Sequence, residues 1–483
     1  MHNLQIEPLL INMPSNPESG HYFVGVAKAL FHLFPEVGNL YEGEINDFAR
    51  KYDLFRAPHF VALGLSAHNT TGRVVYAGAG GEREQQNSLP KPGRRNLRFL
   101  ASEHAGGSAL TTLGVFAALD WQNVFSRSMI SVTGKREKDI YGKVEKDIFS
   151  ETIFKFCESY GIDVDGVADT ASNTWRSVVL IHEIETHSSV RYPGQRIFLD
   201  QGFEDNLTFS PQTVEQLKAQ LNPAQQNLRL IYFDKFLAQP YPFDPEDKDA
   251  KGLLMEYRDV LVNLSSERED VDILYETGGG GSFGLVVEKE FCHDINILTA
   301  SFPFFFRYVL PPEWRKLSSG MDNFDKEQWW QAEFQDETLA IEELLKQVGV
   351  TPGGDSPERF LAPHEWIQGG NQWVRRAHIR RWMVVTLHHF GALVIDLSNR
   401  EAVYIPASHY PDVSSTSGAG DTFRGAFCYQ LLRCIDSHDH YIDQRTTPMQ
   451  CCTQFAVAMA TEKCRKLKLS DGLGHLRELS KRQ

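Results

Sequence analysis

The chain has 483 residues, of which 42% are hydrophobic and 23% are charged, as is ordinary for a soluble globular protein with a buried core. A formal net charge of −14 argues against mainly electrostatic binding to nucleic acid or to an anionic membrane, so neither partner is expected. No apolar run approaches the roughly twenty residues of a membrane helix, and the N-terminus lacks the pattern of a secretory signal. The cysteines are scattered without a Cys-x-x-Cys pair, which favours free thiols in a cytoplasmic protein.

The first 57 residues match no pattern found in the rest of the chain. Helical periodicity recurs at 23–31 and 45–52, which predicts an N-terminal extension, either packed or used as an interaction surface. The core domain is expected to span residues 58–483. It opens with His-Phe-Val-Ala-Leu-Gly-Leu at 59–65, an apolar run with a glycine near its end that is typical of a buried parallel strand.

Two candidate ligand-binding segments follow this strand. Asn69 lies in the sequence His-Asn-Thr-Thr-Gly, where an asparagine is either a turn former or a hydrogen-bonding group for a hydroxyl. Further on, Gly106 and Gly107 precede an apolar helical run that extends through Leu119. Glycines let a ligand approach the backbone closely, so a ligand site is favoured here over a helix N-terminus that only packs against a strand.

Strand-like and helical patterns alternate through the middle of the chain. Strands are predicted at 128–134, 174–185, 189–199, 228–234 and 271–276. The last of these runs directly into Thr-Gly-Gly-Gly-Gly-Ser-Phe-Gly, and α/β proteins bind ligands at such strand ends. Because no Lys-Ser/Thr pair follows, this run is not a Walker-type phosphate loop. A flexible connector is the favoured interpretation.

The segment from 306 to about 378 is a predicted insertion or extension. It contains an acidic helix predicted at 327–348, with Trp329 and Trp330 near its start. A tryptophan pair can stack on a base or a sugar, but packing is the favoured role. Beyond the segment, a strand is predicted at 382–387.

Residues 415–423, Ser-Thr-Ser-Gly-Ala-Gly-Asp-Thr-Phe, follow a strand-like run and open an apolar helical pattern. A Gly-Ala-Gly turn at a helix start leaves backbone N–H groups unpaired at the positive end of the helix dipole, which makes a cradle for an anion. Asp421 would face whatever the turn holds. An anion cradle beside a carboxylate base is the minimum needed to move a phosphoryl group onto a hydroxyl.

This motif resembles the second signature of the ribokinase-like (PfkB) family of sugar and nucleoside kinases, Asp-Thr-x-Gly-Ala-Gly-Asp-x-Phe, with Ser415 in place of the first Asp. The resemblance implies an α/β fold, a ribokinase-like three-layer sandwich with a mainly parallel central sheet, helices on both faces and a small β-lid. It also implies ATP and Mg²⁺ as cofactors and Asp421 as the catalytic base. The residues that would form the anion hole are Gly418, Ala419 and Gly420.

The same resemblance assigns binding roles along the chain. Residues expected to orient the acceptor substrate are Asn69, Gly106, Gly107 and Thr111, where Asn69 and Thr111 stand at an Asp and an Asn position of the family. Residues expected to lie against ATP are Thr386, His388, Gly391 and Thr416, with His388 in place of a family glycine.

Ser301 and Phe304 depart from the family, because they fall where Asn-x-x-Glu usually organises Mg²⁺ and phosphate through water. An aromatic side chain cannot hold a hydrated cation. Two hypotheses therefore stay open: an ATP-dependent kinase acting on a hydroxyl of a small-molecule sugar or nucleoside, and a weakened or inactive ribokinase-like protein that serves as a ligand-binding or regulatory module. A homodimer through the lid also stays open.

Overall fold

The structure is a computed structural model that describes residues 59–63, 67–77, 83–84, 97–133, 137–138, 144–145, 148–169, 176–185, 191–200, 228–233, 271–277, 296–311, 314, 329–367, 382–408, 413–437, 448–466 and 469–482. All structural statements below concern these residues. The first 57 residues and the glycine run after residue 277 fall outside them, so what the sequence predicts there stays a prediction.

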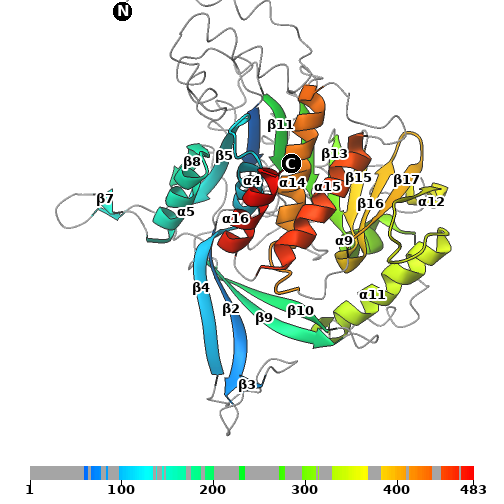
Figure 1. Ribbon diagram of the computed structural model, residues 1–483, viewed down its shortest axis with the longest axis horizontal. Helices are drawn as coiled ribbons and strands as arrows, with labels where there is room; N and C mark the ends of the chain where they lie inside the picture. The colour runs from blue at the N-terminus through cyan, green and yellow to red at the C-terminus, as the bar shows by residue number, and fades with distance from the viewer. Residues whose placement is uncertain are drawn as a thin grey trace, which may run out of the picture.

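One large sheet forms the centre of the molecule (Figure 1). Its strands, in order across the sheet, are β14 (Glu358–Leu361), β17 (Glu401–Pro406), β16 (Gly391–Asp396), β15 (Trp382–Thr386), β13 (Ile297–Ser301), β12 (Asp272–Glu276), β11 (Leu228–Phe233), β1 (His59–Leu63), β5 (Ser126–Thr133) and β8 (Asp163–Asp169). From β15 to β8 every neighbouring pair is parallel, whereas β16, β17 and β14 add an antiparallel edge. The sheet is therefore mainly parallel, and its parallel strands all end at the same edge.

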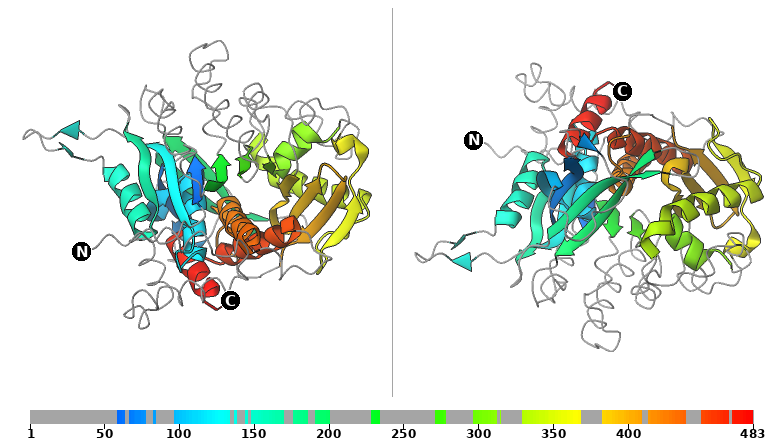
Figure 2. Two further views of the ribbon diagram at one scale, coloured as in Figure 1. Left: turned by 90° about the horizontal axis from the view of Figure 1, so that it is seen from above. Right: turned by 90° about the horizontal axis from the view of Figure 1, so that it is seen from below.

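Helices cover both faces of this sheet, as the two views in Figure 2 show. On one face lie α4 (Ser108–Leu119), α5 (Ile148–Ser159), α14 (Ala419–Ser437), α15 (Pro448–Cys464) and α16 (Leu469–Ser480). On the other lie α9 (Phe302–Phe304), the π-helical turn η3 (Phe305–Val309), α11 (Trp329–Gln347) and α12 (His364–Ile367).

The buried side chains divide between the two faces because neighbouring residues of a strand point to opposite sides. In β12, Leu274 packs in the cluster with α4 and α14, while Ile273 and Tyr275 pack in the cluster with α11. A sheet buried on both faces requires apolar residues at successive positions, which explains the continuous hydrophobic runs in the sequence. The expected α/β sandwich with a mainly parallel sheet is thus confirmed.

A second, smaller sheet projects from the main body (Figure 1). It contains β10 (Arg191–Asp200), β9 (Arg176–Glu185), β2 (Ala67–Ala77), β3 (Arg83–Glu84) and β4 (Leu97–Gly106). β4 leads through Gly107 directly into α4. The sheet thus stands where the β-lid is expected, connected to the start of that helix.

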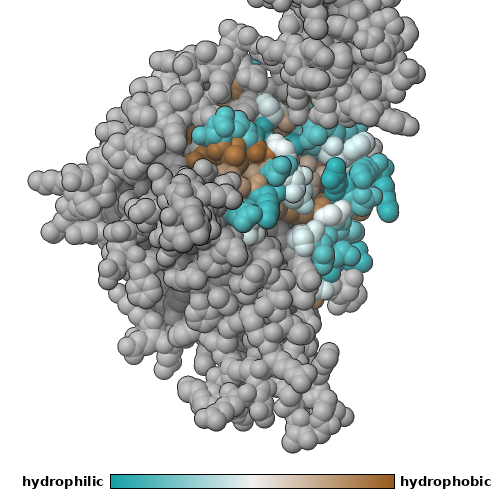
Figure 3. All heavy atoms as spheres, turned by 90° about the vertical axis from the view of Figure 1, so that its left-hand side faces the viewer, coloured by the Kyte–Doolittle hydropathy of each residue, from teal (hydrophilic) through white to brown (hydrophobic). Residues whose placement is uncertain are grey.

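The outer surface near β8 and α5 follows the usual division of an amphipathic helix. In α5, Ile153 and Cys157 are buried, while Lys155 and Glu151 form an exposed ion pair of 2.8 Å. Figure 3 shows this side of the molecule, on which hydrophilic residues surround a smaller hydrophobic area in the part of the chain that is described. None of the described helices is long and apolar enough to cross a membrane.

Close contact between α4 and α14 depends on Gly425. A Cβ at this position would lie 2.4 Å from the carbonyl oxygen of Thr112 and 2.7 Å from Cβ of Val115. Gly425→Ala is therefore expected to destabilise the protein by about 1–3 kcal/mol, because the two helices would have to separate. Denaturant unfolding measures this effect.

Gly474 in α16 provides the matched control. A Cβ there meets no atom within 4 Å, so Gly474→Ala should stabilise its helix by about 0.5–1 kcal/mol. If Gly425→Ala were as stable as Gly474→Ala, the close packing of α4 on α14 would be wrong.

Candidate active site

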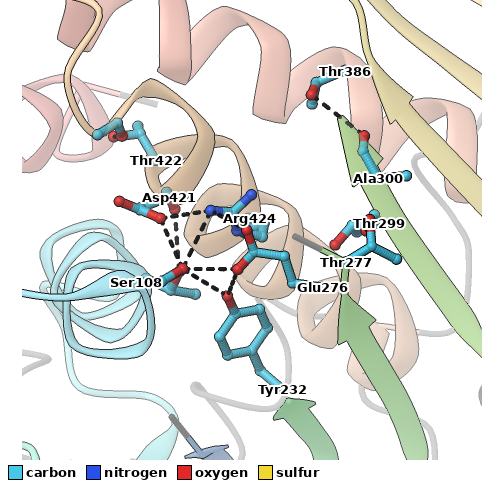
Figure 4. A network of polar contacts seen from close by, with 12 residues as sticks. Ser108, Tyr232, Glu276, Thr277, Thr299, Ala300, Thr386, Asp421, Thr422 and Arg424 are labelled. Carbon is cyan, nitrogen blue, oxygen red and sulfur yellow. Dashed lines mark hydrogen bonds and ion pairs between the residues drawn. The ribbon is translucent and has the colours of Figure 1, made fainter. Parts of the chain in front are cut away.

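The candidate site lies where the starts of two helices meet the ends of two central strands (Figure 4). Ser108 is the first residue of α4, and Asp421 lies in the first turn of α14. Tyr232 and Glu276 stand at the ends of β11 and β12. Carboxyl ends of parallel strands are the usual ligand-binding edge of an open α/β sheet.

The glycine turn has the backbone conformation that an anion cradle needs. Gly418 has a φ of 72°, in the left-handed region that favours glycine. The N–H groups of Gly418 and Gly420 make no hydrogen bond to another described residue, whereas that of Ala419 donates to the carbonyl of Thr416 at 3.1 Å. Of the three predicted donors, the Ala419 amide is therefore already engaged, and two remain open towards a ligand.

Only one of the two carboxylate oxygens of Asp421 accepts hydrogen bonds from the described residues. Oδ1 accepts hydrogen bonds from Nη2 of Arg424 at 2.6 Å and from the hydroxyl of Ser108 at 3.0 Å. Oδ2 has no hydrogen bond within the described residues and lies 4.0 Å from the point that a Cβ on Gly418 would occupy. The side chain keeps 21% of its surface exposed.

Arg424 also pairs with a second carboxylate. Its Nη2 lies 2.9 Å from Oε1 of Glu276. The other oxygen of Glu276 accepts from the Tyr232 hydroxyl and lies 2.8 Å from that of Ser108. Five side chains from α4, α14, β11 and β12, Asp421 among them, thus form one polar network (Figure 4).

Burial and charge act in opposite directions on Asp421. Burial raises the pKa of this carboxyl, the Arg424 guanidinium lowers it, and the Glu276 carboxylate raises it again, with a raised pKa as the net result. For Arg424, burial lowers the pKa, but the Glu276 and Asp421 carboxylates outweigh burial and raise it. The guanidinium is therefore a fixed positive charge, and the proton affinity of the base depends on its two charged neighbours.

Sequence reasoning did not identify four members of this network: Ser108, Tyr232, Glu276 and Arg424. Tyr232 and Glu276 carried a usable signal, because a polar residue at the end of a hydrophobic strand in an α/β chain lies at the ligand-binding edge. Arg424 carried a weaker one, since residues three apart on a helix are neighbours and Asp421 precedes it by three.

The predicted substrate-orienting residues lie in two places. Thr111 is buried in α4, and its Cγ2 lies 3.9 Å from the point that a Cβ on Gly418 would occupy. Gly107 precedes α4 with a φ of 92°, which explains the glycine there, and Gly106 ends β4. Asn69 lies in β2, paired with His104 of β4. The structure thus brings Thr111 and the α4 start to the Gly418 turn, and the role of Asn69 stays a prediction.

The predicted nucleotide-binding residues are at the neighbouring strand ends. Thr386 ends β15, and its hydroxyl donates to the carbonyl of Ala300 at 3.4 Å. Gly391 has a φ of 113°, and a Cβ there would lie 2.0 Å from the carbonyl oxygen of Ile405, so packing against β17 explains this glycine. The Thr416 carbonyl closes the turn before α14.

His388 stands in the left-handed region, with a φ of 50°, which only glycine adopts at no cost. Its Nε2 lies 2.7 Å from Oε2 of Glu337 in α11. This left-handed conformation explains why the ribokinase-like family, which the sequence resembles, has a glycine at this position. Through this contact, the histidine side chain links the end of β15 to α11.

Ser301 and Phe304 do not provide a site for Mg²⁺. Phe304 is 1% exposed and packs in the hydrophobic cluster under α11, and the buried hydroxyl of Ser301 has no partner in the described part of the chain. No group of three or more His, Cys, Asp or Glu side chains within that part could hold a metal ion. Mg²⁺ is usually held by one or two carboxylates and substrate phosphates, and both oxygens of Glu276 are already engaged. Ser301 and Phe304 therefore offer no carboxylate for Mg²⁺.

Comparison with known proteins finds a family model that matches part of the chain. Residues 331–473 match the family model described as "pfkB family carbohydrate kinase". This segment, less than half of the chain, is therefore similar to PfkB carbohydrate kinases. The match includes the glycine turn and Asp421, and it extends into the predicted insertion.

The fold is shared with a solved ribokinase structure. The ribokinase from Giardia lamblia is 13% identical, with a TM-score of 0.54, and the match covers 88% of this chain and all of that one (100%). Ribokinase from Arabidopsis thaliana, complexed with ribose and ATP, is 14% identical with a TM-score of 0.46, covering 88% of this chain and 99% of that chain. A search of the curated proteins finds no match.

Proposed function

We propose that this protein is an ATP-dependent phosphotransferase that moves the γ-phosphate to a hydroxyl of a sugar or nucleoside. The observation that carries the proposal is the position of Asp421. Its Oδ2 lies 4.0 Å from the point that a Cβ on Gly418 would occupy, beside N–H groups at the start of α14 that have no partner among the described residues. The family model describes carbohydrate kinases, which agrees with this chemistry.

In the proposed reaction, Oδ2 of Asp421 accepts the proton of the acceptor hydroxyl while the hydroxyl oxygen attacks the γ-phosphorus. The bond from this phosphorus to the bridging oxygen breaks, and ADP leaves. The N–H groups of Gly418 and Gly420 stabilise negative charge on the transferring group, in a fixed orientation that costs no reorganisation. Ser108 and Arg424 hold the carboxylate by Oδ1 and so keep Oδ2 directed at the substrate.

We propose positions for the two substrates on either side of Asp421. Asn69, Gly106, Gly107 and Thr111 are proposed to surround the acceptor, on the side of α4 and the lid. Thr386, His388, Gly391 and Thr416 are proposed to lie along the nucleotide, on the side of β15 and β16. Trp329 and Trp330 are not assigned to either.

The test is ADP formation from Mg·ATP with a panel of sugars and nucleosides. Turnover with one acceptor class, dependent on Asp421, is the expected result. The assay contains Mg²⁺ because the ribokinase-like family, which the sequence resembles, uses this ion.

A second candidate, a ribokinase-like protein without turnover that binds a ligand or a partner, is favoured by one observation. Phe304 fills the hydrophobic cluster at a position where the family usually has a glutamate, which removes a phosphate-organising group. Saturable binding of a nucleotide or sugar without ADP formation from any acceptor would support this candidate over the kinase.

A further inference from the structure

Lys463 is a buried lysine that the proposed reaction does not use. It lies in the last turn of α15 and is 1% exposed. Its ammonium group makes no hydrogen bond or ion pair with another residue of the described part of the chain. A lysine is almost never buried without a partner, because removing a charged ammonium group from water is strongly unfavourable unless something compensates it.

The ammonium group is directed at the glycine turn. Nζ lies 3.8 Å from the point that a Cβ on Gly418 would occupy. Oδ2 of Asp421 and Cγ2 of Thr111 approach the same point at 4.0 and 3.9 Å. Nζ, a carboxylate oxygen and a methyl group thus all lie around the position that a side chain of Gly418 would occupy.

The local electrostatics make this position unfavourable for a cation unless an anion is bound. The start of α14 carries the positive end of a helix dipole, which repels an ammonium group and attracts a phosphate. Asp421 offers only partial compensation, because its charge is shared with Arg424. The dipole of α15 itself stabilises a cation near the C-terminus of that helix. This stabilisation does not explain why Nζ lies near the start of α14.

α16 holds the lysine stem in this direction. A Cβ on Gly472 would lie 3.0 Å from Cγ and 3.7 Å from Cε of Lys463. Any side chain at position 472 would therefore push the lysine stem aside. The absence of one lets the stem pass between α15 and α16 towards Gly418.

We propose that Lys463 is a phosphate-binding residue of the anion hole, and that its ammonium group contacts the phosphoryl group that is transferred. This inference rests on the proposed function for the identity of the anion, and it adds a positive charge to a site so far built from N–H groups. The ammonium group would neutralise charge on the phosphoryl oxygens as a compact point charge, while Asp421 accepts the proton on the other side.

Binding of two nucleotides to the full chain tests the proposal without any turnover. Calorimetry would compare ADP with the non-hydrolysable β,γ-imido analogue of ATP, on the wild-type protein and on Lys463→Met. We expect the variant to lose affinity for the analogue by about tenfold or more, which is the range of one hydrogen bond to a charged group, and to keep its affinity for ADP. Lys155→Met, at an exposed position of α5, should change neither.

Thermal unfolding separates this role from a structural one. Methionine has a similar shape and no charge, so Lys463→Met should melt at the same or a higher temperature than the wild type without nucleotide, and the analogue should stabilise it less. A lower melting temperature without nucleotide would mean that Lys463 serves the fold, and would overturn the proposal.

Gly472→Ala is the second variant, because it moves the lysine without removing its charge. It should weaken binding of the analogue and leave binding of ADP intact. Equal affinity of wild type and Lys463→Met for the analogue, or an equal loss for both nucleotides, would overturn the phosphate contact. Absence of ADP formation with every acceptor would instead contradict the kinase alone, since the binding difference does not depend on turnover.

Discussion

Asp421→Asn is expected to lower turnover by about 10²–10⁴-fold, the usual contribution of a positioned general base. The amide keeps the shape of the carboxylate but cannot accept the proton from the acceptor hydroxyl. Nucleotide affinity should change little, because the N–H groups of Gly418 and Gly420 belong to the backbone and stay in place. Initial rates of ADP formation and calorimetric nucleotide binding measure the two effects separately.

The control for this variant is Asp471→Asn, an acidic residue that lies exposed in the first turn of α16. It should leave the rate unchanged. Normal turnover by Asp421→Asn would remove Asp421 as the base and would contradict the proposed mechanism.

Arg424→Met should have the second-largest effect. It should lower the stability of the protein and change the pH dependence of the rate. The arginine side chain is 13% exposed and pairs with Asp421 at 2.6 Å and Glu276 at 2.9 Å. Its removal leaves two partly buried carboxylates without their positive partner, which costs about 3–5 kcal/mol when a buried pair is broken. Denaturant unfolding measures this loss.

The pH dependence of the rate has a defined sign. Asp421 acts as a base only when it is deprotonated, so activity is lost as the pH falls through its raised pKa. Arg424 lowers that pKa, and Arg424→Met should therefore move the acid limb of the kcat/KM profile to higher pH. Glu276 raises that pKa, so Glu276→Gln should move the same limb to lower pH.

Arg433 on the same helix is the matched control for Arg424. It is exposed, and its guanidinium lies 5.7 Å from the centre of the Tyr429 ring. Arg433→Met should cost no more than about 1 kcal/mol, the value of an exposed cation–π contact, with no change in the acid limb. Opposite shifts by Arg424→Met and Glu276→Gln would support the network, and shifts in the same direction would refute it.

The sequence predicted the fold because the fold depends on local patterns. Hydrophobic runs such as 228–234 and 271–276 gave central strands, since a sheet buried on both faces needs apolar residues at successive positions. The predicted acidic helix at 327–348 corresponds to α11. The cysteines of the described residues are free, as their spacing indicated.

By itself the sequence also predicts the reaction centre that we propose, since the glycine turn and Asp421 are contiguous and lie at one helix start. Only the tertiary structure decided what surrounds Asp421. Ser108, Glu276 and Lys463 come from α4, β12 and α15, and no pattern along the chain links residues that meet only after the sheet and its helices have packed. The charges around Asp421 are therefore a property of the assembled fold, while its proposal as the base comes from a short motif.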